Sequence, residues 1–336
     1  ISASIEPGIA AIVAILAGCM NSVFRDLHGA RIGPRGSVVC IGAFDGLHLG
    51  HRALVRQATA RARELGVDAT VVSFDPLPRE FFAKGDRPPR LMLPRAKLEG
   101  LRSLGVDVVG LLRFNAALAA MPAESFVREL LVERLGVREV WVGPGFRFGQ
   151  GRHGDLALLQ AIGVDAGFSA HAIAPVLLGG EPVSSTRIRA ALADGDFDLA
   201  ERLLGRRYVV GGHVVRGRQL GRTLGFPTAN LRFGGRHPAL RGVYATLVHG
   251  VGEQPWRSVS SFGTRPTVDG IEPLLEAHLF DFDGDLYGKR IEVEFVAKLR
   301  DEERFPDLAS LVKQMRIDVT RAREILQQRP RLRASA

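Results

Sequence analysis

The chain has 336 residues, of which 46% are hydrophobic and 24% are charged, as expected for a globular protein large enough for two cores. Its two cysteines, Cys19 and Cys40, belong to no CxxC or Cys/His cluster, which argues against structural zinc and a disulfide framework and fits a cytoplasmic protein. The formal net charge of +9 comes from dispersed arginines, since only five of the 45 basic residues are lysines, and it favours anionic small molecules over nucleic acid as ligands.

The N-terminal segment contains an apolar run at residues 9–20. This run is shorter than the ~20 residues that a membrane-spanning helix needs. No basic region precedes it, so a signal peptide is not indicated either. We expect residues 1–19 to be an extension outside the fold, with Met20 as the natural start, so that their removal leaves activity and melting temperature unchanged.

Residues 20–205 are predicted to form an α/β domain, because short apolar runs alternate with helical stretches from residue 36 onward. The runs that predict buried strands are 37–41, 69–74, 106–112 and 139–142. The intervening helices are predicted at 52–65, 95–104, 123–135 and 155–162, and a short closing helix at 196–204. Strands and helices in this order predict a parallel sheet.

A glycine-rich turn joins the first strand to its helix in the sequence IGAFDGLHLGHRALV (residues 41–55). His48 and His51 lie three residues apart in the first helical turn, so both can face one ligand. The helix N-terminus favours an anion there, and imidazoles can stabilise charge on a phosphate leaving group. A solvated histidine pair is the simpler alternative, and a metal pair lacks a third ligand. The preceding turn favours nucleotide binding, with these further candidates: Gly42, Phe44, Asp45 and Gly50.

Residues 206–330 are predicted to form a second domain, in which short strands are separated by Gly, Pro and Asp-Gly turns. Strands are predicted at 208–215, 243–249, 257–262, 274–281 and 291–296. Strands of this length and spacing predict a small barrel. A helix follows at 307–328, with Leu308, Leu311, Val312, Met315, Val319 and Ile325 as its apolar stripe.

A second glycine-rich segment, GRQLGRTLGFPTAN, occupies residues 217–230. Glycines let backbone N–H groups approach a phosphate, and arginine adds charge. The Thr228 hydroxyl and the Asn230 amide can complete a Mg²⁺–nucleotide site. The nucleotide-binding candidates of this segment are Gly217, Gly221, Arg222, Gly225 and Asn230, and the metal ligand is Thr228.

These motifs resemble those of the bifunctional bacterial FAD synthetases. Residues 41–55, SFDPLPREFF (73–82), GFRFGQGRHGD (145–155) and VSSTRIRAAL (183–192) are similar to the adenylyltransferase half, which belongs to the H-x-G-H nucleotidylyltransferases. GFPTAN, RGVYAT (241–246), SSFGTRPTVDG (260–270), LLEAHLFDFDGDLYGKRIEVEF (274–295) and KLRDEERFPDLASL (298–311) resemble riboflavin kinases. The resemblance implies a Rossmann-like nucleotidyltransferase domain and a six-stranded barrel kinase domain with a C-terminal helix.

The resemblance also implies the chemistry and its residues. The kinase would convert riboflavin to FMN with ATP and Mg²⁺, and Glu276 would be its general base. The adenylyltransferase would join FMN to AMP from ATP, giving FAD and pyrophosphate. Its implied triphosphate-binding residues are Ser185, Thr186, Arg187 and Arg189, and the implied flavin-binding residues of the kinase are Arg300, Glu302 and Phe305. Without the resemblance, Glu276 would be interpreted as an outward strand carboxylate. The expected partners are small molecules only, with no nucleic acid or membrane, in a monomer or weak homo-oligomer.

Two departures from the family pattern leave an alternative open. Leu77 replaces the histidine of Pro-His-Pro, and Gly145 replaces the Asp or Asn before Phe-Arg-Phe-Gly. The alternative is a riboflavin kinase with a degenerate or regulatory first domain. A basic nucleic-acid-binding protein would show binding that falls steeply with salt, but the chain has no basic cluster. A pantetheine or cytidylyl transferase would explain residues 41–55 and leave 217–305 unexplained.

Overall fold

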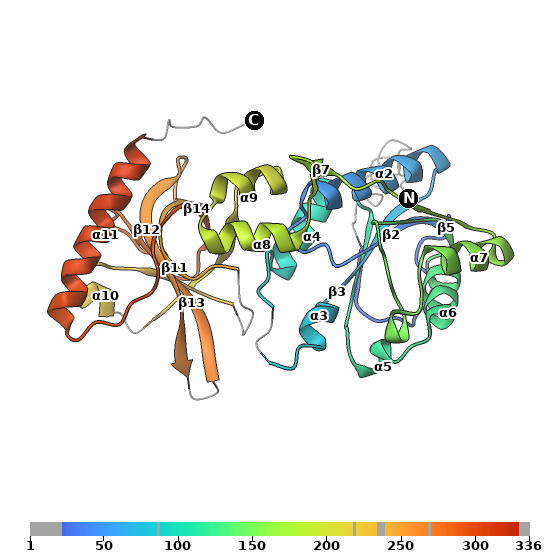
Figure 1. Ribbon diagram of the computed structural model, residues 1–336, viewed down its shortest axis with the longest axis horizontal. Coiled ribbons are helices and arrows are strands. Elements are labelled where there is room, and N and C mark those ends of the chain that lie inside the picture. Colours follow the sequence, from blue (N-terminus) through green and yellow to red (C-terminus); the bar gives the residue numbers. More distant parts are fainter. Residues whose placement is uncertain (1–21, 86–87, 218–219, 234–238, 268–269, 329–336) are drawn as a thin grey trace, which may run out of the picture. The chain divides into compact units, whose positions relative to one another are not determined.

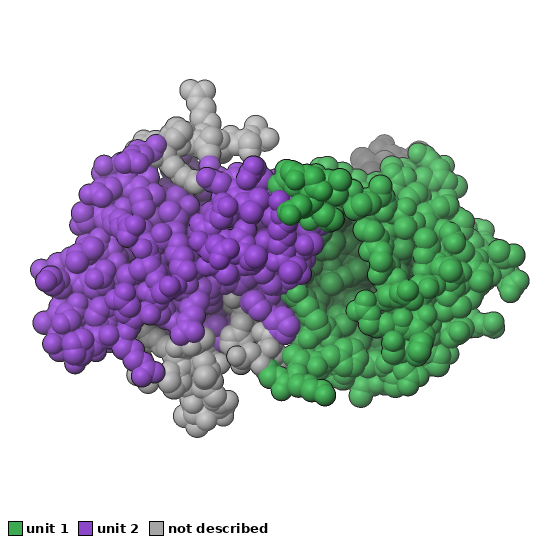
Figure 2. All heavy atoms as spheres, in the orientation of Figure 1, with its two compact units in different colours: residues 1–87, 94–182 green, residues 88–93, 183–336 purple. Residues whose placement is uncertain are grey.

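The structure is a computed structural model that describes residues 22–85, 88–217, 220–233, 239–267 and 270–328 (Figure 1). The chain divides into two compact units, residues 1–87 with 94–182 and residues 88–93 with 183–336 (Figure 2). The predicted extension, residues 1–19, lies outside the described residues. The compact units divide after residue 182. The domain boundary that the sequence places between residues 205 and 206 stays a prediction.

The first unit is built on a six-stranded sheet in which every strand is parallel to its neighbours. The strand order is β1-β4-β3-β2-β5-β6. The strands are β1 (Ser22–Phe24), β2 (Ser37–Ile41), β3 (Asp68–Phe74), β4 (Val108–Leu112), β5 (Val137–Val142) and β6 (Ser169–Ala172). The chain runs from β2 toward β4 on one side and from β5 to β6 on the other. The order therefore reverses between β2 and β5, where open parallel sheets bind ligands beyond the carboxyl ends of their strands.

Helices connect these strands and cover the sheet (Figure 1). They are α2 (Leu49–Leu65), α3 (Pro78–Phe81), α4 (Pro94–Ser103), α5 (Ala116–Ala119), α6 (Ala123–Ser125), the π-helix η1 (Phe126–Arg134), the 3₁₀ turn η2 (Gln150–Arg152) and α7 (Leu156–Ala166). Val39, Val140 and Leu130 are fully buried in the core that the sheet shares with η1. A small hairpin, β7 (Leu177–Leu178) and β8 (Glu181–Pro182), ends the unit. The predicted parallel α/β fold is confirmed.

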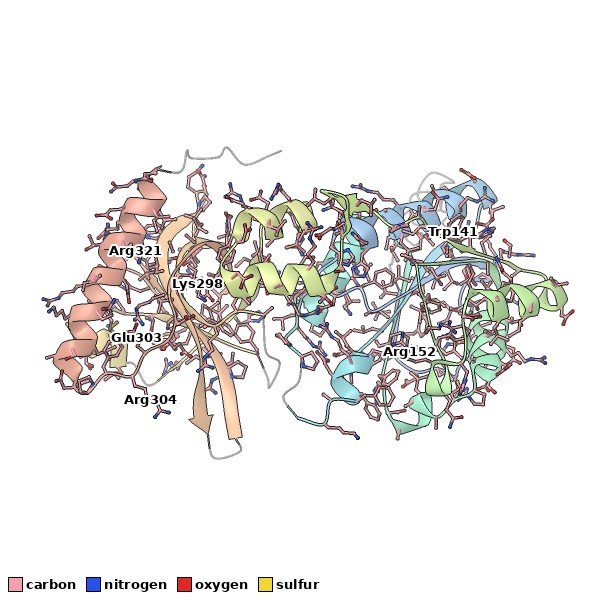
Figure 3. The ribbon with its side chains drawn as sticks, viewed as in Figure 1. Trp141, Arg152, Lys298, Glu303, Arg304 and Arg321 are labelled. Carbon is pink, nitrogen blue, oxygen red and sulfur yellow. The ribbon has the colours of Figure 1, made fainter. Side chains whose placement is uncertain are left out.

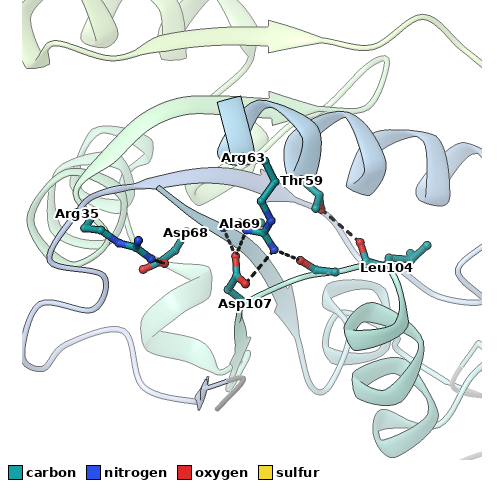
Figure 4. A network of polar contacts seen from close by, with 8 residues as sticks. Arg35, Thr59, Arg63, Asp68, Ala69, Leu104 and Asp107 are labelled. Carbon is teal, nitrogen blue, oxygen red and sulfur yellow. Dashed lines mark hydrogen bonds and ion pairs between the residues drawn. The ribbon is translucent and has the colours of Figure 1, made fainter. Parts of the chain in front are cut away.

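Exposed or partly exposed ion pairs lie at the amino ends of β3 and β4 (Figure 4). The carboxylate of Asp107 accepts hydrogen bonds from Arg63 at 2.6 and 3.0 Å and from the N–H of Ala69 at 2.8 Å. Arg35 donates to Asp68 at 3.1 Å. Such exposed pairs contribute little to stability individually. These ion pairs lie at the amino ends of the strands. The predicted nucleotide motif lies at the opposite edge of the sheet, beyond the carboxyl ends of the strands.

The second unit contains a closed six-stranded barrel in which every neighbouring pair is antiparallel, in the order β10-β13-β12-β11-β14-β9. The strands are β9 (Val209–Val215), β10 (Ala229–Arg232), β11 (Gly242–His249), β12 (Trp256–Thr267), β13 (Gly270–Leu279) and β14 (Arg290–Arg300). The described helices of this unit are α8 (Ser185–Asp194), α9 (Phe197–Leu204), α10 (Leu220–Thr223) and α11 (Leu308–Gln328). The predicted barrel and C-terminal helix are confirmed.

Helices that precede and follow the barrel strands in the sequence pack against the barrel. Ala322 and Leu326 of α11 are buried with Val243 and Val259 of the barrel. At the other end, Lys298 of β14, labelled in Figure 3, donates to the carbonyl of Ala193 at the end of α8 at 3.2 Å. The helices α8 and α9 therefore belong with the barrel in the second compact unit.

Candidate active sites

The first candidate site lies where β2 ends and α2 begins. His48 is the N-cap of α2, and its Nδ1 accepts a hydrogen bond from the backbone N–H of His51 at 3.3 Å. The two imidazole rings stack with their centroids 3.6 Å apart, and the ring of Phe44 lies 5.2 Å from that of His51. Because Nδ1 of His48 is an acceptor, the neutral ring carries its proton on Nε2. The predicted histidine pair is thus assembled at the N-terminus of a 17-residue helix.

Burial keeps both histidines neutral at physiological pH. Desolvation lowers the pKa of His48 to about 4. It also places the pKa of His51 well below its ordinary value, with smaller contributions from His48 and from the positive charge of Lys97. Nδ1 of His51 is buried and has no hydrogen-bond partner among the described residues. Buried polar atoms without a partner often mark the place of a missing ligand or water.

The turn that precedes these histidines is held by buried polar contacts. Asp45 is 2% exposed, and its carboxylate accepts a hydrogen bond from Arg79 of α3 at 2.6 Å. The ring of Phe44 is fully buried and packs against Gly42. Gly50 lies in the first turn of α2. All the nucleotide-binding candidates of residues 41–55 therefore belong to one turn and the start of one helix.

An exposed aromatic cluster follows the carboxyl end of β3. The ring of Phe114 lies 5.4 to 5.8 Å from the rings of Phe74, Phe81 and Phe82. Phe81 and Phe82 are 38% and 61% exposed. Exposed aromatic rings of this kind are typical of a surface that stacks on a planar ligand. Sequence reasoning included residues 73–82 in the family pattern but did not single out these phenylalanines.

The two departures from the family pattern fit the structure locally. Leu77 is 1% exposed and packs in the core, while its backbone N–H donates to the carboxylate of Glu80 at 2.9 Å. Gly145 has a φ of 68°, in the left-handed region that glycine, Asn and Asp adopt most readily. Gly145 lines a pocket of about 190 Å³ at the carboxyl end of β5, together with Phe146, Arg147 and Asp155. The backbone of this pocket is compatible with glycine.

The predicted triphosphate-binding residues lie on α8 in the second unit. The Ser184 hydroxyl caps this helix by accepting a hydrogen bond from the N–H of Arg187 at 3.2 Å. Ser185 and Thr186 occupy its first turn. The guanidinium of Arg189 donates to the carbonyl of Pro89 at 2.8 Å. The contact of Arg189 with Pro89 joins α8 to the segment 88–93 of the same unit.

The second candidate site lies on neighbouring strands of the barrel. Asn230 of β10 is directly opposite Glu276 of β13, and Glu276 is also opposite Ser261 of β12. Residues that face each other across antiparallel strands present their side chains on the same face. Asn230 is 5% exposed, its Nδ2 donates to the carbonyl of Thr228 at 3.1 Å, and its buried Oδ1 has no hydrogen-bond partner among the described residues.

The glycine-rich segment packs closely over Asn230. A Cβ at Gly217 would lie 2.9 Å from the side-chain amide of Asn230, so a larger residue there would displace this amide. Gly221 and Arg222 are in the short helix α10, and the N–H of Phe226 donates to the carbonyl of Gly221 at 2.7 Å. Gly225 has a φ of 85°. Residues 218–219 of the predicted loop lie outside the described residues.

His278 supports the same segment. Its Nδ1 lies 2.9 Å from the carbonyl oxygen of Pro227, and its ring meets that of Phe226 edge to face at 5.5 Å. Burial lowers the pKa of His278, so the ring is neutral and donates this hydrogen bond.

The predicted flavin-binding segment joins β14 to α11, where Glu303 and Arg304 are labelled in Figure 3. The Arg300 guanidinium donates to Asp318 of α11 at 2.8 to 3.1 Å and lies 5.6 Å from the ring centroid of Phe305. The Glu302 carboxylate accepts a hydrogen bond from Arg241 at 3.0 Å. Arg300 therefore joins the strand to the last helix, a contact that sequence reasoning missed.

The fold defines a class of protein in which an open parallel α/β sheet and a closed antiparallel barrel occur in one chain. A FAD synthetase family model matches residues 31–187, and a riboflavin kinase family model matches residues 204–326. The chain belongs to the bifunctional riboflavin kinase/FMN adenylyltransferase family.

Relatives from several bacteria match nearly the whole chain. The bifunctional riboflavin kinase/FMN adenylyltransferase of Pseudomonas fluorescens is 47% identical over 90% of this chain and 96% of its own. The protein of the same name from Escherichia coli (strain K12) is 44% identical over 90% of this chain and 97% of its own. A solved structure titled macrolide-efflux protein from Streptococcus pneumoniae superposes with a TM-score of 0.73 at 30% identity, covering 90% of this chain and 98% of that one. In the described part of this chain, no helix is long and apolar enough to cross a membrane.

Proposed function

We propose that the barrel phosphorylates riboflavin to FMN and that the parallel-sheet unit transfers AMP from ATP to FMN. Both activities are those of the family, and the main interpretation of the sequence is supported over a degenerate first domain. The observation that carries the assignment of sites is that each predicted site holds a buried polar atom with no hydrogen-bond partner in the described part of the chain, Nδ1 of His51 in one and Oδ1 of Asn230 in the other.

In the adenylyl transfer, an oxygen of the FMN phosphate attacks the α-phosphorus of ATP. The bond from that phosphorus to the bridging oxygen breaks, and pyrophosphate leaves. The neutral imidazoles of His48 and His51 donate hydrogen bonds to phosphate oxygens, and the N-terminus of α2 adds its positive potential. No side chain acts as a nucleophile, because positioning and charge stabilisation suffice for this step.

The remaining candidate groups of the first unit shape its turn and bind the flavin. Gly42, Phe44, Asp45 and Gly50 shape the turn. The family resemblance assigns the triphosphate to Ser185, Thr186, Arg187 and Arg189, which lie on α8 of the second unit. The exposed rings of Phe81 and Phe82, which pack against Phe114, stack on the isoalloxazine of FMN. An aromatic surface explains how a planar flavin is recognised by a unit whose other candidate groups recognise phosphate.

In the kinase reaction, Glu276 takes the proton of the ribityl 5′-hydroxyl as that oxygen attacks the γ-phosphorus of ATP, and ADP leaves. Gly217, Gly221, Arg222 and Gly225 bind the phosphates through backbone N–H groups and charge. The flavin contacts Arg300, Glu302 and Phe305. The ion pair with Asp318 holds Arg300 in place.

The kinase site fits a magnesium ion that is bound mainly by nucleotide phosphates. Among the described residues no group of three or more His, Cys, Asp or Glu side chains is arranged to hold a metal. Mg²⁺ ordinarily keeps several waters and takes one or two protein oxygens beside phosphate. The unpartnered Oδ1 of Asn230 and the hydroxyl of Thr228 are oxygens of that kind. When bound, the ion would neutralise charge on the transferring phosphates.

We also propose that the enzyme acts in the cytoplasm on small molecules alone, without nucleic acid, as a monomer or weak homo-oligomer.

Assays of purified protein with riboflavin, ATP and Mg²⁺ test the two activities together. The kinase assignment requires FMN from riboflavin, and the adenylyltransferase assignment requires FAD from supplied FMN. A protein that makes FMN but no FAD would restore the alternative of a degenerate first domain.

A further inference from the structure

A buried lysine supports the turn between β2 and α2 in the adenylyl-transfer site. Lys97 lies on α4 and is 2% exposed. Its Nζ donates to the carbonyl oxygen of Ala43 at 2.7 Å and contacts the hydroxyl of Ser73 at 3.0 Å. The Ser73 hydroxyl donates to the same carbonyl at 3.1 Å. Two donors from separate elements thus converge on one carbonyl of the turn between β2 and α2.

The turn needs such support because its backbone is strained. Phe44 and Leu47 have φ angles of 47° and 42°, in the left-handed region that residues with a side chain rarely adopt. Each such residue costs roughly 1–3 kcal/mol and persists only where its surroundings fix it. Helix α4 also supports Leu47, because a Cβ at Gly100 would lie 2.6 Å from the Leu47 side chain. The helix therefore holds both the carbonyl of Ala43 and the side chain of Leu47.

The charge of Lys97 does more than a neutral donor could do. Removing an ammonium from water is costly, whereas a hydrogen bond to a carbonyl needs no charge. In this position the charge lies near the histidine pair, where it lowers the pKa of His51 in addition to burial and His48. The acidic group of the turn, Asp45, is already paired with Arg79 of α3. A buried positive charge beside the N-terminus of α2 also strengthens the attraction for a polyphosphate.

We propose that Lys97 is a positioning residue of the adenylyl-transfer reaction, acting through the carbonyl of Ala43 and the side chain of His51. The proposal rests on the function proposed above for this unit. It assigns to α4 a part in catalysis that none of the recognised motifs contains. The ammonium holds the turn in the conformation that presents the histidines, and its charge adds to burial and to His48 in lowering the pKa of His51.

The test compares three substitutions of Lys97 in the full-length chain. Lys97→Met removes charge and hydrogen bonds, Lys97→Gln keeps a donor without charge, and Lys97→Arg keeps the charge. We expect Lys97→Met to lower kcat for FAD formation from FMN roughly 10²-fold, as misplacement of a catalytic turn does. Loss of the positive charge also raises the pKa of His51, so the acid limb of the pH–rate profile moves to higher pH in Lys97→Met and Lys97→Gln. Lys97→Arg should retain the wild-type profile.

Two controls separate this role from simple structural support. Arg102→Met replaces an exposed cation on the same helix and should leave FAD formation unchanged. Riboflavin phosphorylation, measured on the same samples, reports on the other unit and should be unaffected. A Lys97→Met protein that loses melting temperature but keeps the wild-type kcat and pH profile would overturn the proposal. If Lys97→Met does not fold, the pH profile of Lys97→Gln decides in the same way. Wild-type protein that makes no FAD would instead refute the proposed function.

Discussion

Asn230 and Glu276 face each other across the β10–β13 ladder of the barrel, and the amide oxygen of Asn230 has no hydrogen-bond partner among the described residues. The pair places an oxygen suited to Mg²⁺ on the same face as the carboxylate proposed to act as the base.

Glu276→Gln removes the proton acceptor and preserves the shape of the side chain. We expect the rate of FMN formation from riboflavin to fall roughly 10²-fold or more, because general-base catalysis contributes about that much. FAD formation from supplied FMN should be unchanged and serves as the control. An unaltered kinase rate would show that Glu276 is only a strand carboxylate.

Asn230→Ala removes the unpartnered amide oxygen. We expect the Mg²⁺ concentration for half-maximal riboflavin phosphorylation to rise roughly tenfold, in line with the loss of a group that supports a metal site. The Mg²⁺ dependence of FAD formation in the same protein is the internal comparison. If Asn230→Ala needs the same Mg²⁺ concentration as the wild type for half-maximal riboflavin phosphorylation, Asn230 has no part in holding the ion.

The histidine pair should make the stability of the first unit depend on pH. The pKa of His48 is lowered to about 4, below its ordinary value of 6.5, so the unfolded state binds a proton that the folded state does not. Stability is therefore retained above pH 6.5 and lost as pH falls toward 4. Urea unfolding at pH 7 and pH 5 should show this loss, and His48→Gln should reduce it. If the wild type and His48→Gln lose the same unfolding free energy between pH 7 and pH 5, the assignment is contradicted.

The ion pair between Arg300 and Asp318 should stabilise the barrel. Asp318 is 5% exposed, and Arg300 donates to both of its carboxylate oxygens. Asp318→Ala leaves a largely buried guanidinium without this partner, which should cost about 2–4 kcal/mol of unfolding free energy. Glu324→Ala, at an exposed position of the same helix, is the matched control and should cost little. Comparable unfolding midpoints for the two variants would rule out this role.

Most of the fold was predictable because its strands are either buried runs or turn-bounded segments. The strand at residues 37–41 was predicted with the bounds of β2. Strand β10 was not predicted, because its four residues follow directly on the GFPT turn and carry no periodicity of their own. In α11 the predicted stripe was partly wrong: Leu308 is 58% exposed, whereas Ala322 and Leu326 are buried, because the later turns of the helix pack on the barrel.

The sites were less predictable than the fold, because sequence motifs name the residues near a ligand and omit those that hold them. Arg79 and Lys97 support the first turn from α3 and α4, through contacts that no local spacing predicts. One signal was available for Lys97: it is one of few lysines in an arginine-rich chain, four residues before the buried Leu101 on the same helix face. The exposed phenylalanines likewise become a cluster only when β3 and β4 lie side by side.

The most direct test of the account is a time course of purified protein with riboflavin, ATP and Mg²⁺, with FMN and FAD separated by chromatography. We predict that FMN appears first and FAD follows, and that His51→Ala accumulates FMN while forming FAD roughly 10²-fold more slowly. FMN that accumulates without FAD in the wild-type protein would contradict the assignment of the first unit. Absence of both products from folded protein would contradict the account as a whole.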